Sequence, residues 1–271
     1  MLSDADLQFV TRECKARSGA VLTREMAALI EQRLTPIARR ESFSSVSEFV
    51  TAARTREDGK LAGAIADALI QSETRFFRDR AGFAHLRDAI PALAHKKGGA
   101  LRILCAGAST GQEAYSIAML TEELRQEGQL IGAEIIGIDA SERLLDKARS
   151  GLYTQFEVQR GLPIRKLIAH FEKAGDLWRI SDRMRARVRF ERVNLLETLD
   201  ALGRFDLILC ANVLAAFDAP TRLATLDRLG DVLEPHGLLV LGQGEALPEG
   251  ADSFAAHGAA YGKSPTARAA A

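Results

Sequence analysis

The first third of the chain has apolar residues at the spacing of an amphipathic helix. The positions are Leu7, Val10 and Cys14; Leu29, Ile30, Leu34 and Ile37; and Leu61, Ile65 and Leu69. Intervals of three and four match the 3.6 residues of a helical turn. Ser45, followed three residues later by Glu48, is the pattern of a capping box at a helix start. We therefore predict an all-helical domain of four or five short helices over residues 1–94.

From residue 95 onward, short β-rich apolar runs alternate with helical stretches. The runs are LRILCA (101–106), EIIGID (134–139), FDLILC (205–210) and LLVLGQ (238–243), and the helical stretches are 112–125, 141–148 and 219–234. This alternation is typical of a parallel sheet with crossover helices. The fold class predicted for residues 95–271 is therefore α/β, with a doubly wound, mostly parallel sheet. An Ala/Gly-rich tail after Leu247 is expected to be partly irregular.

The segment 151–197 is too long for a plain crossover. It contains a helix-like stretch, PIRKLIAHF, and two short strand candidates around Trp178 and Val188. We expect a small β-subdomain inserted there.

Composition excludes several classes of protein. Thirty-six Lys and Arg balance 36 Asp and Glu, so the chain lacks the overall positive charge that draws proteins to nucleic acid or anionic membranes. No apolar run approaches the roughly 20 residues that span a bilayer. The amino end has early acidic residues and no apolar signal core. We expect a cytoplasmic protein with no membrane insertion and no nucleic-acid partner.

The cysteines and histidines do not form a metal-binding pattern. Three cysteines are widely spaced without a CxxC motif, and five histidines are equally scattered. This spacing suggests neither a disulfide framework nor a zinc site. We expect buried reduced thiols and no metal.

The loop after the first predicted strand has the composition of a ligand loop. It reads Cys105-Ala-Gly-Ala-Ser-Thr-Gly-Gln-Glu113 and leads directly into a helix. Small residues allow backbone amides to approach a ligand, and an anion is favoured at the helix start. The spacing is neither GxGxxG nor that of a P-loop. A nucleotide-type cofactor is one interpretation, and a tight turn without ligand is the other.

The next predicted strand supports the cofactor interpretation. It ends at Asp139, where the adjacent strand of such a fold contacts a ribose. A hydrogen bond from a ribose hydroxyl to a charged acceptor contributes about 1.5 to 3 kcal/mol. The alternative role of Asp139 is to cap the helix that begins near Ser141.

Five segments share their order and spacing with one known family. They are SETRFFRD (72–79), AGASTGQEAYSIAM (106–119), IDASERLLDKARSGLY (138–153), FEVQRGLP (156–163) and FDLILCANVLAAFD (205–218). They resemble the CheR-type chemotaxis receptor methyltransferases. The resemblance implies a Rossmann-like class I fold and S-adenosylmethionine (SAM) as methyl donor. It also implies that the acceptor is a receptor glutamate, which becomes a glutamyl methyl ester in chemotaxis adaptation while SAM becomes S-adenosylhomocysteine (SAH).

The resemblance also assigns residues. Arg78 is the implied catalytic residue, whose guanidinium would hold the donor's carboxylate or the incoming glutamate, and Asp139 is placed on the ribose. The implied cofactor contacts are Ser72, Thr74, Arg78, Glu113, Asp139, Asn194, Leu195, Ala211 and Asn212. Simpler roles stay open: a solvated helix-end charge for Arg78, a capping hydroxyl for Thr74, a turn residue for Asn194 and a first-turn acid for Glu113.

The chain departs from the family near the expected chemistry. Ala211 and Ala216 stand where the family usually has Arg and Tyr, Ser72 where Asn is common, and Gln112 where Glu is common. An aromatic ring near the sulfonium contributes roughly 0.5 to 2 kcal/mol. Its loss predicts transfer slowed about tenfold or more, unless Tyr115 or another aromatic compensates. The alternative function is a catalytically weak or inactive SAM- or SAH-binding signalling protein.

The same family resemblance has implications for partner recognition. Some family members grip a receptor's carboxyl-terminal pentapeptide through a Gly-x-Gly insertion, and HFEKAGDLWRI lacks it. We expect a monomer that works without this tether and meets the receptor's methylation helices through a basic surface. Two surfaces are candidates, residues 159–192, with ten Lys or Arg and four Asp or Glu, and arginines in the helical domain, which we favour. A nucleic-acid amino-methyltransferase is disfavoured, because CANVL has no Pro-Pro-aromatic signature.

Overall fold

The computed structural model describes residues 2–70 and 73–264. These residues form two compact units, one of residues 2–70 with 216–221 and one of residues 73–215 with 222–264. The division differs from the expected boundary near residue 94. Helix α5 (Arg80–Lys97) belongs to the second unit, because its apolar face packs into the core of the sheet through Leu86, Ile90 and Leu93.

Four α-helices and one short 3-10 turn build the first unit. They are α1 (Asp4–Ser18), η1 (Arg24–Met26), α2 (Ala27–Arg40), α3 (Val46–Thr55) and α4 (Gly59–Leu69). Their apolar faces meet in one core around Ile30, Leu34 and Phe49. The predicted cap is present, since the Ser45 hydroxyl accepts the Glu48 amide at 3.1 Å, although the Glu48 carboxylate accepts from Ser44 instead of Ser45.

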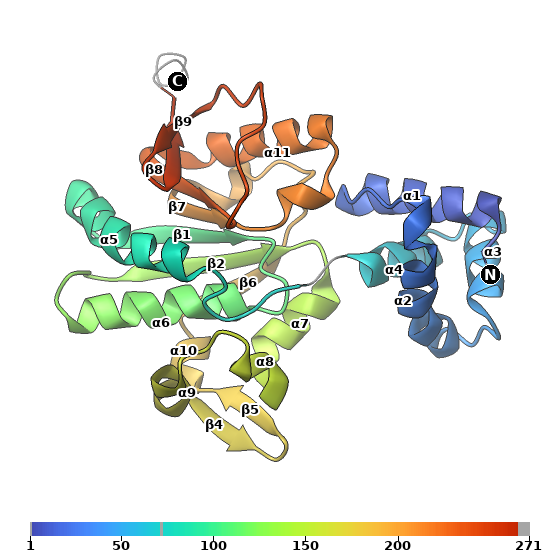
Figure 1. Cartoon of the computed structure of the whole chain (residues 1–271), viewed down its shortest axis with the longest axis horizontal. Helices are drawn as coiled ribbons and strands as arrows, with labels where there is room; N and C mark the ends of the chain where they lie inside the picture. Colours follow the sequence, from blue (N-terminus) through green and yellow to red (C-terminus); the bar gives the residue numbers. More distant parts are fainter. Residues whose placement is uncertain (1, 71–72, 265–271) are drawn as a thin grey trace. The chain divides into compact units, whose positions relative to one another are not determined.

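A seven-stranded sheet forms the centre of the second unit. Its order is β6-β2-β1-β7-β8-β10-β9, and Figure 1 shows the strands side by side. The first five strands pair in parallel, β10 pairs antiparallel with β8, and β9 pairs antiparallel with β10. The bounds are β1 (Leu101–Ala106), β2 (Ala133–Asp139), β6 (Val188–Arg192), β7 (Phe205–Cys210), β8 (Leu233–Leu241), β9 (Phe254–His257) and β10 (Ala260–Lys263). The predicted α/β class is confirmed, and part of the Ala/Gly-rich tail is the ordered hairpin β9–β10.

Helices connect the parallel strands, as the alternating pattern predicts. They are α6 (Gln112–Gln126), α7 (Glu142–Ser150) and α11 (Ala219–Asp231), with two short 3-10 turns, η2 (Asp200–Leu202) and η3 (Leu214–Ala216). Strand β1 lies between β2 and β7, so both of its edges are paired. Its side chains at 101, 103 and 104 are fully buried. The loop at its carboxyl end therefore rests on a rigid base.

A second, three-stranded antiparallel sheet is inserted between α7 and β6, with the order β3-β5-β4. Its elements are β3 (Leu152–Thr154), α8 (Gln155–Gln159), α9 (Ile164–His170), β4 (Phe171–Ala174), β5 (Leu177–Ile180) and α10 (Asp182–Arg185). The strand candidate around Trp178 is part of this small sheet. The candidate around Val188 is instead β6, which pairs with β2 in the large sheet.

Ion pairs attach this inserted subdomain to α6. Glu122 on α6 is 1% exposed and forms ion pairs with Arg125, Arg183 and Arg187. The hydrogen bond from Arg125, together with the charges of Arg187 and Arg125, outweighs burial and lowers the pKa of Glu122 to about 2. Several basic residues of the 159–192 run are therefore engaged in contacts inside the unit.

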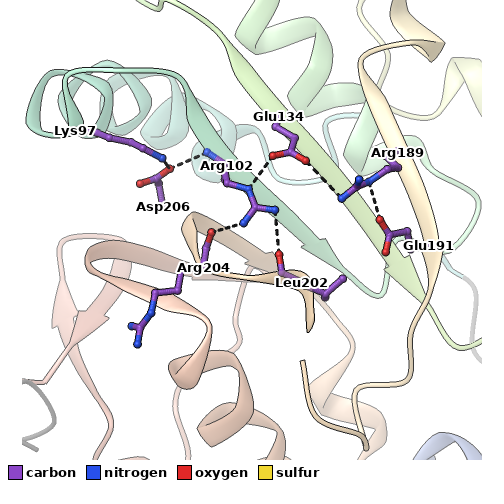
Figure 2. Close-up of polar contacts among 8 residues, drawn as sticks. All are labelled: Lys97, Arg102, Glu134, Arg189, Glu191, Leu202, Arg204 and Asp206. Carbon is purple, nitrogen blue, oxygen red and sulfur yellow. Dashed lines mark hydrogen bonds and ion pairs between the residues drawn. The ribbon is translucent and has the colours of Figure 1, made fainter. Parts of the chain in front are cut away.

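A polar network crosses the strands at their amino-terminal ends, opposite the edge where the predicted ligand loop lies. Figure 2 shows Lys97 and Arg102 converging on Asp206, and Arg102 joined to Glu134. Asp206 is fully buried, and it accepts from Lys97 Nζ at 2.6 Å and from the Arg102 amide at 2.7 Å. These contacts hold β1, β2 and β7 in register at the edge that carries no candidate site residue.

The three cysteines, at positions 14, 105 and 210, are buried and unpaired. No helix within 2–70 or 73–264 is long and apolar enough to cross a membrane. Among the same residues, no group of three His, Cys, Asp or Glu side chains could hold a metal ion.

Candidate ligand site at the carboxyl edge of the sheet

The loop between β1 and α6 folds tightly against the loop that follows β7. Gly107 has a φ of +72°, a left-handed conformation that favours glycine, and a Cβ there would meet Val213 Cγ2 at 2.3 Å. Gly111, with a φ of +89°, precedes the first residue of α6. Both glycines are therefore required by the backbone path, which agrees with the tight-turn interpretation and leaves the backbone of the loop close to the sheet edge.

Asp139 at the end of β2 holds this loop in place. One carboxylate oxygen accepts the Ser109 amide at 2.9 Å and the other accepts the Ser141 amide at 2.9 Å. The helix cap itself is the Ser141 hydroxyl, which accepts the Leu144 amide. A carboxylate offers about four acceptor positions, so these two bonds are compatible with a ribose contact. The alternative role of Asp139 as a helix cap belongs to Ser141 instead.

Glu113 in the first turn of α6 is a buried carboxyl group beside two arginines. Its side chain is 8% exposed. Burial raises the pKa of Glu113 to about 7, the nearby Glu245 also raises it, and Arg78 and Arg75 oppose the rise. A simple first-turn acid at the surface would not be buried in this way, so the structure gives Glu113 the environment of a site residue.

A cavity of about 140 Å³ lies beside Glu113 at this edge. Four of the residues assigned by the resemblance line it: Arg78, Glu113, Ala211 and Asn212. The other lining residues are Arg75, Asp79, Gly82, Phe83, Leu86, Leu209, Val240, Leu241, Gly242 and Gln243. Pockets for drug-sized ligands have volumes of roughly 300 to 1,000 Å³, so the cavity has room for one end of a nucleoside ligand.

A second, wider hollow of about 520 Å³ shares part of this wall. Arg75, Arg78, Asp79 and Gln243 line both spaces. The wider hollow adds Phe77, Arg80, Ala81 and Gly161.

Arg78 does not behave as a solvated helix-end charge. It precedes α5, lines both spaces, and donates from Nη1 to the Glu73 carbonyl at 2.6 Å. Phe76, two residues before Arg78, anchors the segment. Its side chain is fully buried and makes edge-to-face contacts with Tyr153 and Phe171. The guanidinium of Arg78 is therefore positioned at the cavity by a rigid backbone.

Asn194 and Leu195 lie farther along the same edge. They follow β6, whose last residue pairs with Asp139, and the Asn194 side-chain oxygen accepts the Leu196 amide at 3.1 Å. The predicted turn role of Asn194 is thus present, and Leu195 is buried. Neither residue lines the 140 Å³ cavity. Both follow the strand that pairs with the one that ends at Asp139.

Thr74 and Ser72 are the remaining residues of the predicted set. Thr74 has a buried hydroxyl without a hydrogen-bond partner among the described residues, so it does not act as a capping hydroxyl there. Ser72 lies outside the described residues.

The structure adds two site residues that the sequence analysis missed. Arg75 lines both spaces. Glu245 follows β8 and accepts the amides of Asn212 at 2.7 Å and Gly242 at 2.8 Å, which fixes the Asn212 loop at the cavity. Glu245 has no local sequence signal, whereas Arg75 lies within the SETRFFRD segment and could have been singled out as a second arginine.

Tyr115 does not compensate for the missing aromatic. It is 1% exposed, lies in the core, and donates its hydroxyl hydrogen bond to the Ala148 carbonyl at 2.8 Å. The aromatic side chain that lines the 140 Å³ cavity is Phe83. Gln112 is also turned inward, where it accepts from the Thr110 hydroxyl at 2.7 Å. Ala216 belongs to the first unit, in which its carbonyl accepts the Val21 amide.

The residues present fit a SAM-type ligand. The orphaned Thr74 hydroxyl, the cavity-lining Arg78 and Glu113, and Asp139 on the next strand supply the hydrogen-bonding and charged groups that such a ligand needs. A parallel α/β sheet with these features at its carboxyl edge defines the α/β class of SAM-dependent methyltransferases.

Comparison with known proteins agrees with this class. Residues 72–262 match the family described as CheR methyltransferase, SAM binding domain. The chain is 34% identical over 257 residues to chemotaxis protein methyltransferase 1 of Vibrio cholerae serotype O1, with 93% of each chain covered. It is also 34% identical over 251 residues to chemotaxis protein methyltransferase 1 of Pseudomonas aeruginosa, with 90% of this chain and 91% of that one covered. The chain belongs to the CheR methyltransferase family, and SAM is its cofactor.

Proposed function

We propose that this protein transfers a methyl group from SAM to glutamate side chains of chemoreceptors in the cytoplasm. The products would be a glutamyl methyl ester and SAH, and the modification would serve chemotaxis adaptation. The observation that carries the proposal is the buried Glu113 beside Arg75 and Arg78 in a cavity at the carboxyl edge. Relatives named chemotaxis protein methyltransferases, at 34% identity over nine-tenths of the chain, support the chemotaxis role.

The reaction needs alignment more than proton transfer. A glutamate with a pKa near 4.3 is ionised at neutral pH, so its oxygen attacks a methyl group without a general base. The cofactor supplies the electrophilic sulfonium methyl. The chain's own task is to hold the acceptor oxygen in line with that group, a near-attack geometry that can account for about 7 to 11 kcal/mol of a barrier. The absence of a His-carboxylate pair from the lining of the cavity agrees with this chemistry.

Each candidate residue has a task in this scheme. Asp139 would accept hydrogen bonds from the ribose hydroxyls. Asn194 and Leu195, which follow the neighbouring strand β6, would contact the adenine. Glu113 and Arg78 would hold the charged amino-acid end in the cavity. The walls beside them would come from Ala211 and Asn212. Thr74 and Ser72 stay cofactor contacts that the family resemblance implies.

The two alanines at family positions bear on the rate. Ala211 lines the cavity without a polar side chain, so we expect slow methyl transfer. The alternative, a SAM-binding protein without catalysis, is less favoured because the chain belongs to a methyltransferase family and retains a lined cavity beside an ionisable glutamate.

Partner recognition would not use a pentapeptide tether. The strands β4 and β5 are joined by a two-residue turn, Gly175-Asp176, which leaves no room for a Gly-x-Gly insertion. We propose that a single copy of the chain engages the receptor's methylation helices directly. In the helical unit Arg54 is paired with Asp6 and Arg33 bonds to the carbonyls at 69 and 70, so Arg39 and Arg56 are the better candidates for receptor contact.

The proposal is tested with labelled SAM and cytoplasmic receptor fragments. We expect alkali-labile label on fragments whose methylation sites are glutamate, and none on fragments with aspartate at those sites. Calorimetry with SAH on the same preparation shows whether the donor site is intact. Binding of SAH without ester formation on any fragment would contradict the proposed activity and favour the inactive alternative.

A further inference from the structure

Arg75 has an unusual environment for an arginine next to a cavity. Its Nε is buried and forms no hydrogen bond with any described residue, whereas the neighbouring Arg78 already donates to the Glu73 carbonyl. A buried donor without an acceptor is costly, and more so when it is charged. Such a group calls for an acceptor, which a bound ligand or an ordered water can supply.

The backbone holds Arg75 at the junction of the two spaces. Phe76 is fully buried, and the Phe77 amide donates to the Ser116 hydroxyl on α6 at 3.0 Å. On the far side, Gly161 has a φ of +94°, and a Cβ there would meet the Phe76 carbonyl oxygen at 2.0 Å. The segment that follows Arg75 is therefore clamped between α6 and the loop of the inserted subdomain.

The wider hollow has a positive charge balance. Arg75, Arg78 and Arg80 line it together with one acid, Asp79. Asp79 caps α5, because its carboxylate accepts the Ala81 amide at 3.0 Å. A concave surface with three guanidinium groups attracts an anionic partner and favours bidentate contact with carboxylates.

Other basic residues near this hollow are engaged elsewhere. Arg160 pairs with Glu73 at 3.2 Å, and Lys166 pairs with Glu123. The guanidinium of Arg75 is thus distinguished from these side chains by its lack of an ion pair and by its place on both the cavity and the hollow.

We propose that Arg75 binds the acceptor's carboxylate, and that the 520 Å³ hollow is the entrance through which an acidic peptide segment presents that carboxylate to the smaller cavity. This inference rests on the proposed function, and it adds the acceptor side of the site. Arg78 and Glu113 then serve the donor's charged end, while Arg75 selects glutamate over glutamine by supplying a cation for an anionic side chain.

The test measures binding and does not depend on turnover. Arg75→Gln, Arg75→Lys and the control Arg204→Gln are saturated with SAH; Arg204 is an exposed arginine that directly precedes β7 and lies outside both candidate receptor surfaces. Each is titrated with cytoplasmic chemoreceptor fragments from the source organism in all-glutamate and all-glutamine forms. We expect Arg75→Gln to weaken binding of the glutamate form at least tenfold, with the Kd for SAH changed less than threefold. Arg75→Lys is expected to recover part of the loss, and Arg204→Gln to match the unmodified protein.

The outcomes separate this inference from the proposed function. Equal affinity of Arg75→Gln and Arg204→Gln for the glutamate form would overturn it, as would a loss of SAH affinity as large as the loss of fragment affinity. Failure of every fragment to bind the unmodified protein would also overturn it. Fragment binding that depends on Arg75 without ester formation would support the acceptor site while contradicting the proposed catalysis. Thermal melting of each variant checks that the fold is retained.

Discussion

Substitution of Glu113 is expected to change both the stability of the protein and its affinity for SAH, because this carboxyl group is buried beside the cavity. Its pKa is raised from 4.5 to about 7 by burial, with Glu245 adding to the rise. A carboxyl group with a raised pKa in the folded state is easier to bury when protonated. Folding is therefore opposed by Glu113 as the pH rises from 4.5 to 7, and the full penalty applies above pH 7.

The size of the penalty follows from the pKa difference. A pKa difference of about 2.5 at about 1.36 kcal/mol per pKa unit is about 3.4 kcal/mol at most. The substitution Glu113→Gln removes the ionisation and keeps the side-chain shape. We expect Glu113→Gln to have a higher unfolding free energy than the unmodified protein. This gain is expected to be about 2.5 kcal/mol larger at pH 8 than at pH 5.

Urea denaturation at the two pH values measures this difference, with Glu172→Gln as a control because Glu172 is exposed on β4. Calorimetry with SAH supplies the second half of the prediction. The same Glu113→Gln variant is expected to bind SAH at least tenfold more weakly at pH 8, because it has lost a charged acceptor. A Glu113→Gln effect on stability that is the same at pH 5 and pH 8 would refute the reasoning about burial.

Three further predictions follow from the same structure. Asp139→Ala should weaken SAH binding at least tenfold, in line with about 1.5 kcal/mol for a charged hydrogen bond, and an unchanged dissociation constant in calorimetry would mean that the donor site is misplaced. Asp206→Asn should lower the unfolding free energy by about 1.5 to 3 kcal/mol at pH 7. Burial would raise the pKa of Asp206, but hydrogen bonds from Lys97, Arg102 and His236 outweigh burial and lower this pKa. The loss should therefore shrink in urea titrations as the pH falls below about 4, and a constant loss would contradict the assignment. Tyr115→Phe should cost about 1 kcal/mol of stability, from the bond to the Ala148 carbonyl, and leave kcat unchanged; a large fall in kcat would return Tyr115 to the site.

The sheet and most of its edge could be predicted because the signals are local. Four apolar runs give four of the parallel strands, and parallel strands place their carboxyl ends at one edge. The loop at 107–111, Asp139 and Asn212 therefore come together without any knowledge of packing. The cap at Ser45 was equally readable, since it needs only residues three apart.

The remaining features depend on contacts between distant residues. The two compact units divide near residue 71 and not near 94, because the apolar stripe of α5 does not reveal which core the helix joins, and it joins the core of the sheet. Tyr115 has the same sequence context whether it faces a ligand or the core. Glu245 acts on the Asn212 loop across 33 positions of sequence, and only the fold brings them together.

A crystal structure with bound SAH tests the central claim most directly. We expect the ribose hydroxyls of SAH to donate hydrogen bonds to the Asp139 carboxylate, and the amino-acid end of SAH to lie in the cavity between Glu113 and Arg78. SAH bound elsewhere on the chain, with that cavity filled by the protein's own side chains, would contradict it.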